Sequence, residues 1–392
     1  MYVERSIKDA FLKAADTYGI VALVGPRQAG KTTFLRERMK GLKASYVSFD
    51  DPDARSLFED DVKRFERQYM EGFEVTVLDE AQYCSSAGIK LKYLADAGRR
   101  IWMTSSSETL LGKEILSFLV GRVTIMRLYP FALREYLEAA GQKEYTEAIL
   151  QRRVWEHLAY GGYPRAVITQ DADMKKTILK DLYDTMILKD AAQTFSIEDV
   201  SALDGFARYL AANSGALFSY ENVSRDLKMP FQTARKYLSA LEKSYLIVPV
   251  APYHTNKTKE ITKQPKVYFI DTGLRNAITK SFPAHVAGKD FENYVLCELI
   301  KHGYSPKYWR TKSGAEVDFV IEKDGKTIPL EVKTKAKAGQ IEKSLASYID
   351  TYKPDKAVIV SYEGSRSSAN VKGCEIAYEG PLGMIDALDL SR

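Results

Sequence analysis

The stretch Gly25-Pro-Arg-Gln-Ala-Gly30-Lys31-Thr32-Thr33 follows the pattern G-x-x-x-x-G-K-[ST]. An apolar run, Gly19 to Val24, comes before it, and a helical pattern from Lys31 to about Lys40 comes after it. This strand–loop–helix context is typical of a phosphate-binding loop and argues against a chance Gly-Lys-Thr turn. Gly30 lets the backbone wrap close to phosphates, whose charge meets loop amides and a helix N-terminus. We therefore predict that ATP binds to Gly25, Pro26, Arg27, Gln28, Ala29, Gly30, Lys31, Thr32 and Thr33.

Two acidic residues at the end of a later apolar stretch complete this predicted site. Val75-Thr-Val-Leu78 precedes Asp79 and Glu80, which puts both carboxylates at the carboxyl-terminal edge of a strand. Asp79 is expected to orient a water on Mg²⁺, with the Thr32 hydroxyl as a metal ligand, and Glu80 to polarise the attacking water. Lys31 is expected to reach the β- and γ-phosphates. A merely solvated acidic pair is the alternative, but the upstream loop favours Mg²⁺-dependent ATP hydrolysis.

Further apolar stretches indicate the fold around this loop. Strands are predicted at residues 44–49, 100–104 and 123–128, with helical patterns between the strands. Unalternated apolar strands of this kind indicate a parallel sheet covered on both faces, and hence an α/β fold. Thr104-Ser105-Ser106 ends one of these strands. This turn can place a hydroxyl, for which we choose Ser105, on the γ-phosphate, or it can be an ordinary turn.

A family resemblance rests on five features: the loop, Asp79-Glu-Ala-Gln82, the Ser-rich turn, Gly121-Arg122 and Leu128-Tyr-Pro-Phe131. Together they resemble the bacterial and archaeal AAA+ ATPases of the AAA_14 type, related to the STAND and origin-recognition branches. The resemblance covers essentially the whole chain. It implies an arginine directed at the γ-phosphate, with Arg122 as first candidate and Arg165 as second, acting within one subunit or across an oligomer interface. It also implies a lid in which Gly162-Tyr163-Pro164 either touches the nucleotide or forms a plain turn between helices.

Residues 218–243 predict a helix-turn-helix, with the turn at residues 228–230. The start of the second helix offers polar side chains of the kind that enter a major groove. The Lys-rich segment from His254 to Lys266 would be the wing of a winged helix that contacts phosphates. The predicted nucleic-acid contacts are Gln232, Arg235, Lys236, Lys257, Lys259 and Lys263. The alternative is a winged helix used only for packing, with a solvated hairpin.

The last quarter of the chain carries a second acidic pattern. Asp318 lies on one predicted strand, and Glu331 and Lys333, which share a face because they are two residues apart, lie on the next. If the hairpin Lys323-Asp-Gly-Lys326 pairs these strands, Asp318 and Glu331 can bind Mg²⁺ and Lys333 can position water. This pattern resembles the PD-(D/E)XK nuclease fold, with Glu292 as the acid of its first helix. The resemblance implies that Asp318, Glu331 and Lys333 are the catalytic residues. The alternative is an inactive version used for binding or assembly.

Length and composition limit the remaining possibilities. The 392 residues exceed one ordinary core, and changes of pattern divide them into an AAA+ core (1–145), a helical lid (146–213), a winged helix (214–284) and a nuclease-like α/β domain (285–392). No apolar run approaches the roughly 20 residues of a membrane helix. The N-terminus lacks a secretory h-region, and three cysteines without metal-ligand spacing suggest a reducing compartment, so a cytoplasmic location is expected. A net charge of +5 is too mild to prove nucleic-acid binding.

These predictions combine into an ATP-driven protein that acts on DNA, including branched or broken ends, with deoxyribonuclease activity left open. A second class also fits: a STAND-like switch in which ATP controls assembly and the nuclease-like domain serves only for protein interaction. A third is an antitoxin or defence component whose partner is another protein. Self-association into an oligomer is compatible with each class.

Overall fold

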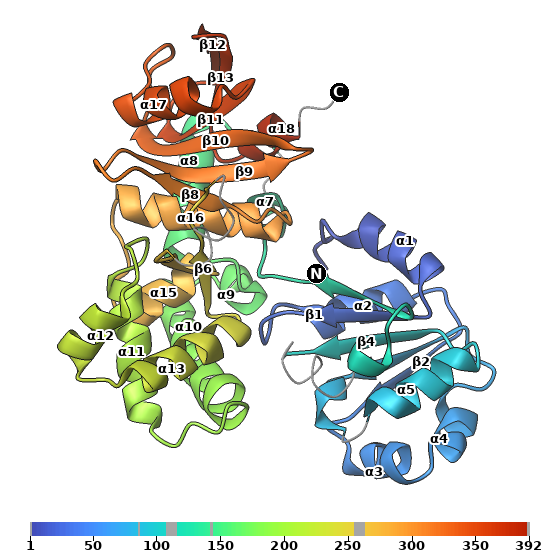
Figure 1. Ribbon diagram of the computed structural model, residues 1–392. Coiled ribbons are helices and arrows are strands. Elements are labelled where there is room, and N and C mark those ends of the chain that lie inside the picture. The colour runs from blue at the N-terminus through green and yellow to red at the C-terminus, as the bar shows by residue number, and fades with distance from the viewer. Residues whose placement is uncertain (1, 85–86, 107–115, 142–143, 255–262, 390–392) are drawn as a thin grey trace. The chain divides into compact units, whose positions relative to one another are not determined.

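The computed structural model describes residues 2–84, 87–106, 116–141, 144–254 and 263–389 (Figure 1). The chain forms two compact units. The first contains Met1–Pro130, Leu188–Ile197 and Lys243–Tyr245, and the second contains Phe131–Ile187, Glu198–Glu242 and Leu246–Arg392. Among the described residues, no helix has the length and apolar character needed to cross a membrane.

The first unit is built on a five-stranded parallel sheet in the order β2-β3-β4-β1-β5. Its strands are β1 (Ile20–Val24), β2 (Ala44–Ser48), β3 (Val75–Asp79), β4 (Ile101–Ser105) and β5 (Val123–Arg127). Every residue of β1, β3 and β4 is buried, as expected for strands covered on both faces. The parallel α/β fold predicted from the sequence is therefore confirmed for this unit.

Helices cover this sheet. They are α1 (Lys8–Thr17), α2 (Lys31–Met39), α3 (Pro52–Asp60), α4 (Val62–Tyr69) and α5 (Ala87–Asp96), with short 3₁₀ turns at Ala81–Tyr83 and Leu116–Phe118. Phe11 of α1 and Phe34 of α2 meet edge to face, with ring centroids 5.0 Å apart, in one apolar cluster with residues of β1 and β3. The helix after the loop is thus fixed to the sheet by its own apolar residues.

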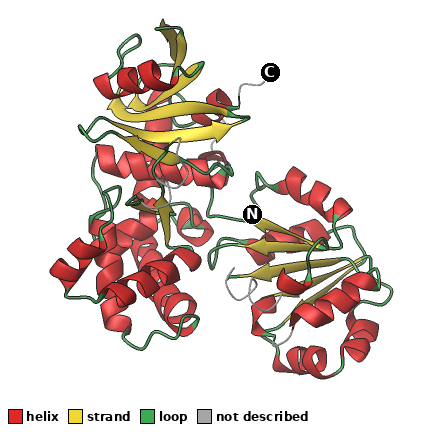
Figure 2. Ribbon diagram, in the orientation of Figure 1, coloured by secondary structure: helices red, strands yellow, loops and turns green. Residues whose placement is uncertain are grey.

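The second unit begins with helices and continues into a small hairpin sheet (Figure 2). The helices are α7 (Leu133–Ala139), α8 (Glu147–Tyr160), α9 (Pro164–Ile168), α10 (Ala172–Thr185), α11 (Val200–Ala212), α12 (Tyr220–Leu227) and α13 (Phe231–Lys243). A π-helix, Met186–Gln193, follows α10. Strands β6 (Ile247–Val250) and β7 (Lys266–Phe269) pair antiparallel, and α15 (Thr272–Thr279) follows.

A six-stranded sheet completes the second unit, in the order β12-β13-β11-β10-β9-β8. Its elements are α16 (Gly288–Lys301), β8 (Lys307–Arg310), β9 (Glu316–Lys323), β10 (Lys326–Lys335), α17 (Lys343–Tyr352), β11 (Lys356–Glu363), β12 (Ser367–Val371), β13 (Cys374–Glu379) and α18 (Met384–Leu388). Asp324 and Gly325, both at positive φ, join β9 to β10 in the two-residue turn that such hairpins favour.

Gly162-Tyr163-Pro164 forms a closely packed turn between α8 and α9. The Gly162 N–H donates to Asp271 Oδ2 at 2.8 Å, and a Cβ at Gly162 would lie 2.3 Å from the carbonyl oxygen of Phe131. Burial raises the pKa of Asp271, whose carboxylate also caps α15 through the Leu274 N–H. Within the second unit these contacts are those of a structural turn, the second of the two interpretations given above.

Candidate functional site

The loop after β1 has the backbone that phosphate binding requires. Gly25 has φ 147° and Gly30 has φ 99°, and α2 begins directly after Gly30 at Lys31. A Cβ on Gly25 would lie 2.1 Å from the carbonyl oxygen of Leu128, so no other residue fits there without displacing the backbone after β5. The loop therefore presents the N-terminus of a nine-residue helix at the carboxyl end of β1.

The ammonium of Lys31 is turned back onto the loop. Its Nζ donates to the carbonyl oxygens of Gly25 at 2.8 Å and Pro26 at 3.0 Å, and only 5% of the residue is exposed. Burial lowers the pKa of Lys31, because the charged form has lost its water. An anion placed inside this loop would offset that cost, so the position of Lys31 fits a phosphate group.

The carboxylate of Asp79 is held by three hydroxyl groups. Thr32 Oγ1 donates to it at 3.0–3.1 Å, and Tyr46 and Thr104 donate at 2.5 Å each. Asp79 is buried at the end of β3. Burial of the Tyr46 hydroxyl, followed by its hydrogen bond to Asp79, raises the pKa of Tyr46 to about 12. A carboxylate beside the loop threonine is the donor set that Mg²⁺ takes together with phosphate oxygens, so these residues fit that ion.

Glu80 lies beside this set in a strained backbone conformation. Its φ of 57° turns the chain sharply after β3, and its N–H donates to Thr104 Oγ1 at 2.9 Å. Glu80 Oε2 accepts hydrogen bonds from Gln82 and, at 3.3 Å, from Ser106. Thr104 thus contacts both acids and fixes their spacing.

The Ser-rich turn lies at the end of β4, and the contact predicted for Ser105 with the γ-phosphate stays a prediction. Ser105 is fully buried at the end of β4, opposite Val24 in the strand register. The hydroxyls that reach the two acids belong to its neighbours Thr104 and Ser106. Alternation along a strand places residues two apart on one face, which is the signal that could have selected this pair.

Arg27 of the loop pairs with a residue that the sequence did not reveal. Its guanidinium binds Asp190 in a bidentate manner, with NH2 to Oδ1 at 2.8 Å and Nε to Oδ2 at 3.1 Å. Asp190 belongs to the part of the π-helix that lies in the first unit, and its carbonyl oxygen accepts a hydrogen bond from Ser244 at 2.9 Å. The Asp190 hydrogen bonds raise the pKa of Arg27. The loop is therefore tied to two segments distant in sequence.

Arg122 lies at the amino ends of the strands, whereas the loop lies at their carboxyl ends. It directly precedes β5, and its carbonyl oxygen accepts from the N–H of Ile20 at the amino end of β1. Its guanidinium pairs with Asp96 at 2.6 Å. The loop follows the carboxyl end of β1, so the parallel register sets Arg122 and the loop at opposite ends of the strands. The role of Arg122 on a phosphate stays a prediction. Arg165 is an exposed residue of α9 in the second unit.

The second unit brings Asp318, Glu331 and Lys333 together. The antiparallel register of β9 and β10 pairs Leu330 with Phe319, the residues next to Glu331 and Asp318 in the chain. Asp318 Oδ2 accepts from the Val332 N–H at 2.8 Å, and Lys333 Nζ pairs with Glu331 at 2.9 Å. Lys333 also pairs with Glu342 at 2.7 Å, before α17, a partner that the sequence pattern did not identify.

A second group of charges adjoins this centre. Lys266 Nζ pairs with Glu292 at 3.1 Å and with Glu316 at 2.5 Å, and Tyr268 donates to Glu292 at 2.5 Å. Burial and the nearby carboxylates raise the pKa of Tyr268 well above its ordinary value. Lys266 was predicted only as part of a wing, yet it is buried and neutralises two acids here.

The fit of a metal to this centre depends on Glu331. Its Oε1 is buried without a hydrogen-bond partner, while its Oε2 pairs with Lys333. A cavity of about 200 Å³ opens beside Glu331 and Lys333 and is also lined by Lys335, Lys337 and Gln340. Within the described ranges, no group of three or more His, Cys, Asp or Glu has the arrangement of a metal site. A cation here would bind to Asp318 and Glu331 as two acids, with the unpartnered oxygen as one ligand atom.

The pKa of Asp318 gives a testable pH dependence. Burial, followed by the charges of Glu292 and Glu331, raises it to about 8. The folded state then binds a proton that the unfolded state releases near pH 4, so stability falls as pH rises from about 4 to about 8. We expect Asp318→Asn to raise the unfolding temperature at pH 8.5 by about 5 °C and to leave it unchanged at pH 4. Calorimetric scans across this pH range measure the difference.

Asp324→Asn is the matched control, because Asp324 lies in the β9–β10 turn at positive φ, a conformation that Asn also accepts. Parallel curves of unfolding temperature against pH for wild type and Asp318→Asn would contradict the account. Millimolar Mg²⁺ should raise the wild-type unfolding temperature at pH 8.5, because the cation offsets the paired acids, and should do so less in Asp318→Asn.

Four of the six residues predicted to contact nucleic acid lie in the part of the chain that the structure describes. Gln232, Arg235 and Lys236 are exposed on the first two turns of α13, and Lys263 is exposed before β7. Lys257 and Lys259 lie outside the described residues. The element order α12, turn, α13, β6 and β7 agrees with the helix and strand pattern of the sequence.

Comparisons with known proteins agree with the geometry of the first unit. Residues 17–137 match the family model AAA_14, described as an AAA domain. Residues 151–285 and 287–377 match models described as domains of unknown function, DUF8612 and DUF4143. The parallel sheet, the loop and the domain match together define an AAA-type P-loop ATPase domain in the first unit.

Relatives of the whole chain are uncharacterized proteins. One from Haemophilus influenzae is 25% identical over 341 residues, which are 81% of this chain and 83% of that protein. One from Mycobacterium tuberculosis is 29% identical over 352 residues, which are 85% and 74% of the two chains. Among solved structures, the Walker-type ATPase PABY2304 of Pyrococcus abyssi is similar, with 14% identity, a TM-score of 0.48, and coverage of 71% of this chain and 96% of that one.

Proposed function

We propose that the protein hydrolyses ATP in the first unit to act on DNA, and that the carboxylate centre of the second unit is a nuclease-like site. The ATPase part of this proposal rests on the arrangement of the phosphate-binding loop. The buried Lys31 is hydrogen-bonded to two loop carbonyls, and Thr32 is hydrogen-bonded to Asp79 beside it. These groups lie at the carboxyl ends of parallel strands, which is where such sheets bind ligands.

The chain's own residues have distinct roles in this proposal. Backbone amides of residues 25–33 and the Lys31 ammonium hold the phosphates, and Thr32 and Asp79 hold Mg²⁺. The bound Mg²⁺ and ATP supply the phosphoanhydride and the cation that neutralises its charge. Glu80, oriented by Gln82 and Ser106, takes a proton from the attacking water.

Self-association is part of the proposal. Arg122 lies at the amino ends of the strands, away from the loop of its own subunit, which favours a role on a phosphate bound by a neighbouring subunit. Such an arginine would stabilise charge that develops on the phosphoryl group. A native mass measurement with and without ATP tests this point, and a chain that stays monomeric in both conditions contradicts it.

Two observations support the DNA half. Gln232, Arg235 and Lys236 lie exposed at the start of the second helix of a helix-turn-helix element order. Asp318, Glu331 and Lys333 are brought together on paired strands beside a cavity with two further lysines. Paired acids with an adjacent lysine can bind a cation and stabilise charge on a phosphodiester.

The test is the ATPase rate with and without single-stranded, duplex, forked and junction DNA, with cleavage followed on gels in Mg²⁺. We expect at least one DNA to raise the rate, and any cleavage to disappear in Asp318→Asn and in Lys333→Met. Cleavage that persists in both variants would contradict the assignment of the centre. A rate unaffected by every DNA, with no binding at low salt, would contradict the DNA half.

A second function is favoured by the Arg27–Asp190 pair. This pair connects the phosphate-binding loop to a segment that continues directly into the helices of the second unit. A nucleotide that moves the loop would act on that segment, as in an ATP-controlled switch whose nuclease-like domain serves only for protein interaction. ATP-dependent protection of residues 188–197 in hydrogen exchange, without any effect of DNA, would distinguish this function from the first.

A further inference from the structure

A second cavity in the second unit lies along the edge strand β8. It has a volume of about 330 Å³ and is lined by side chains from β8, its following turn and the residues before β7, among them Lys263, Gln264, Tyr308, Arg310, Thr311 and Lys312. It is separate in its lining residues from the cavity beside Glu331 and Lys333.

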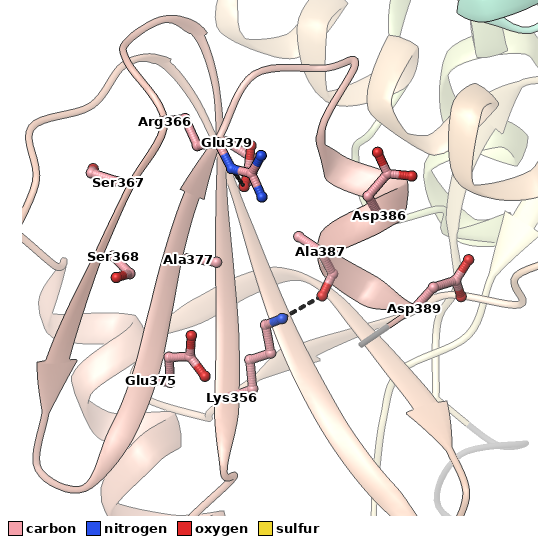
Figure 3. A pocket seen from close by; sticks show the side chains of 10 residues that line it. All are labelled: Lys356, Arg366, Ser367, Ser368, Glu375, Ala377, Glu379, Asp386, Ala387 and Asp389. Atoms are coloured by element: carbon pink, nitrogen blue, oxygen red, sulfur yellow. Dashed lines mark hydrogen bonds and ion pairs between the residues drawn. The ribbon is translucent and has the colours of Figure 1, made fainter. Parts of the chain in front are cut away.

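Among the described residues that line this cavity, every charged side chain is positive. Lys263, Arg310 and Lys312 contribute three cations. A larger cavity of about 640 Å³ near α18 shows the contrast (Figure 3): its carboxylates outnumber its cations, Arg366 pairs with Glu379 at 2.9 Å, and Lys356 donates to the Ala387 carbonyl at 2.6 Å. The acidic cavity would repel a polyanion, whereas the β8 cavity would attract one.

Hydrogen bonds hold the segments that carry the cations of the β8 cavity. The Thr311 N–H donates to the Ala315 carbonyl at 2.9 Å, and Thr311 Oγ1 is hydrogen-bonded to Ser313 Oγ at 2.9 Å. The turn that carries Lys312 is therefore held by both backbone and side-chain hydrogen bonds. The buried Tyr308 donates to the Gln264 carbonyl at 2.6 Å and connects this turn to the segment of Lys263.

Arg310 keeps donor capacity for a ligand. Its ion pair with Glu316, from Nη1 to Oε2, is long at 3.5 Å, and 43% of the Arg310 side chain is exposed. A guanidinium has five N–H donors in a planar fork, the geometry that matches two oxygens of a phosphate.

The strand register places the β8 cavity near the carboxylate centre. Arg310 lies opposite Glu316 in the β8–β9 register. Glu316 shares a strand face with Asp318, two residues or about 7 Å further along β9. Lys266 joins Glu316 to Glu292 between the two places. A phosphate on Arg310 would therefore lie within about one or two nucleotides of the acids.

We propose that the β8 cavity binds the phosphodiester backbone of a DNA strand that enters the carboxylate centre, with Arg310, Lys312 and Lys263 as its ligands. This inference rests on the proposed function and gives it a second contact surface, distinct from the start of α13. The contact is to the backbone, so it is independent of base sequence.

The test compares DNA affinity of the full chain with that of Arg310→Ala/Lys312→Ala, by fluorescence anisotropy of a labelled single strand and a labelled duplex over a range of salt. We expect the double variant to bind ten- to a hundredfold more weakly, roughly, and its plot of log affinity against log salt to be shallower by about two. The ATPase rate without DNA should stay at the wild-type value.

The matched control is Lys326→Ala/Lys372→Ala, which removes two exposed lysines of the same unit that pair with Asp355 and Asp350. It should bind as the wild type does. Lys312→Glu alone, in an exposed turn, serves if the double variant does not fold. Wild-type affinity and salt slope in a folded variant would overturn the inference and leave the proposed function intact, whereas a wild type that binds no DNA would overturn both.

Discussion

Lys31→Met is expected to weaken binding of an ATP analogue by about 30-fold or more, because the variant loses charge-assisted hydrogen bonds to phosphate worth about 2 kcal/mol or more. The methionine keeps the apolar length of the stem and removes the only side-chain ammonium that contacts the Gly25 and Pro26 carbonyls in the described loop. Isothermal titration with Mg²⁺ and the analogue measures the change, and hydrolysis should fall in parallel.

Lys40→Met is the control for this variant, since Lys40 ends the same helical stretch but is exposed and paired with Glu37 at 2.7 Å. The unfolding temperature of Lys31→Met without nucleotide should equal or exceed that of the wild type, because burial disfavours the ammonium. Equal analogue affinity in Lys31→Met and Lys40→Met would contradict the assignment of the loop.

Glu80→Gln is expected to bind ATP within threefold of the wild type and to hydrolyse it about 10²–10³ times more slowly, the usual effect of losing a general base. Glutamine keeps the volume of the side chain and can accept hydrogen bonds from Gln82 and Ser106, so the site should keep its geometry. Single-turnover hydrolysis measured beside analogue titration separates the two effects.

Glu71→Gln provides the comparison, because Glu71 is exposed in the turn before β3. Turnover of Glu80→Gln at the wild-type rate would show that another group activates the water. A loss of binding equal to the loss of turnover would instead assign Glu80 to nucleotide affinity.

The sequence was most informative where short-range pattern and chemistry coincide. The loop from Gly25 to Thr33 and the acids after β3 are each contiguous, and a parallel sheet places their strand ends at one edge, so one pattern predicted the centre of the first unit. The β9–β10 hairpin is equally local, and its two-residue turn pairs the strands so that Asp318 accepts a hydrogen bond from Val332, next to Glu331.

The remaining contacts could not be predicted because they join distant segments. Asp190 lies 163 residues from Arg27, and Tyr46 lies 33 residues from Asp79, in stretches whose own pattern is that of an ordinary helix or strand. Lys266 ends a Lys-rich segment whose composition is typical of a solvated hairpin, yet the packing of β7 buries it between Glu292 and Glu316. Such pairs depend on tertiary packing, which propensity and periodicity do not encode.

Arg122 shows the corresponding limit for function. Gly121-Arg122 supported a family resemblance, and the resemblance suggested a catalytic arginine. The strand register instead places this residue beside Ile20, at the amino end of β1, where it pairs with Asp96. A motif thus indicates a family, but the distance of its arginine from the phosphate-binding loop depends on the end of the strand at which that arginine lies.

The most direct measurement is a crystal structure of the full chain grown with Mg²⁺ and a non-hydrolysable ATP analogue. The account predicts that the triphosphate lies in the loop of residues 25–33, with Lys31 Nζ moved from the Gly25 and Pro26 carbonyls onto phosphate oxygens and the metal beside Thr32 and Asp79. Analogue bound elsewhere, or a loop with Lys31 still on its own carbonyls at saturating analogue, would contradict it.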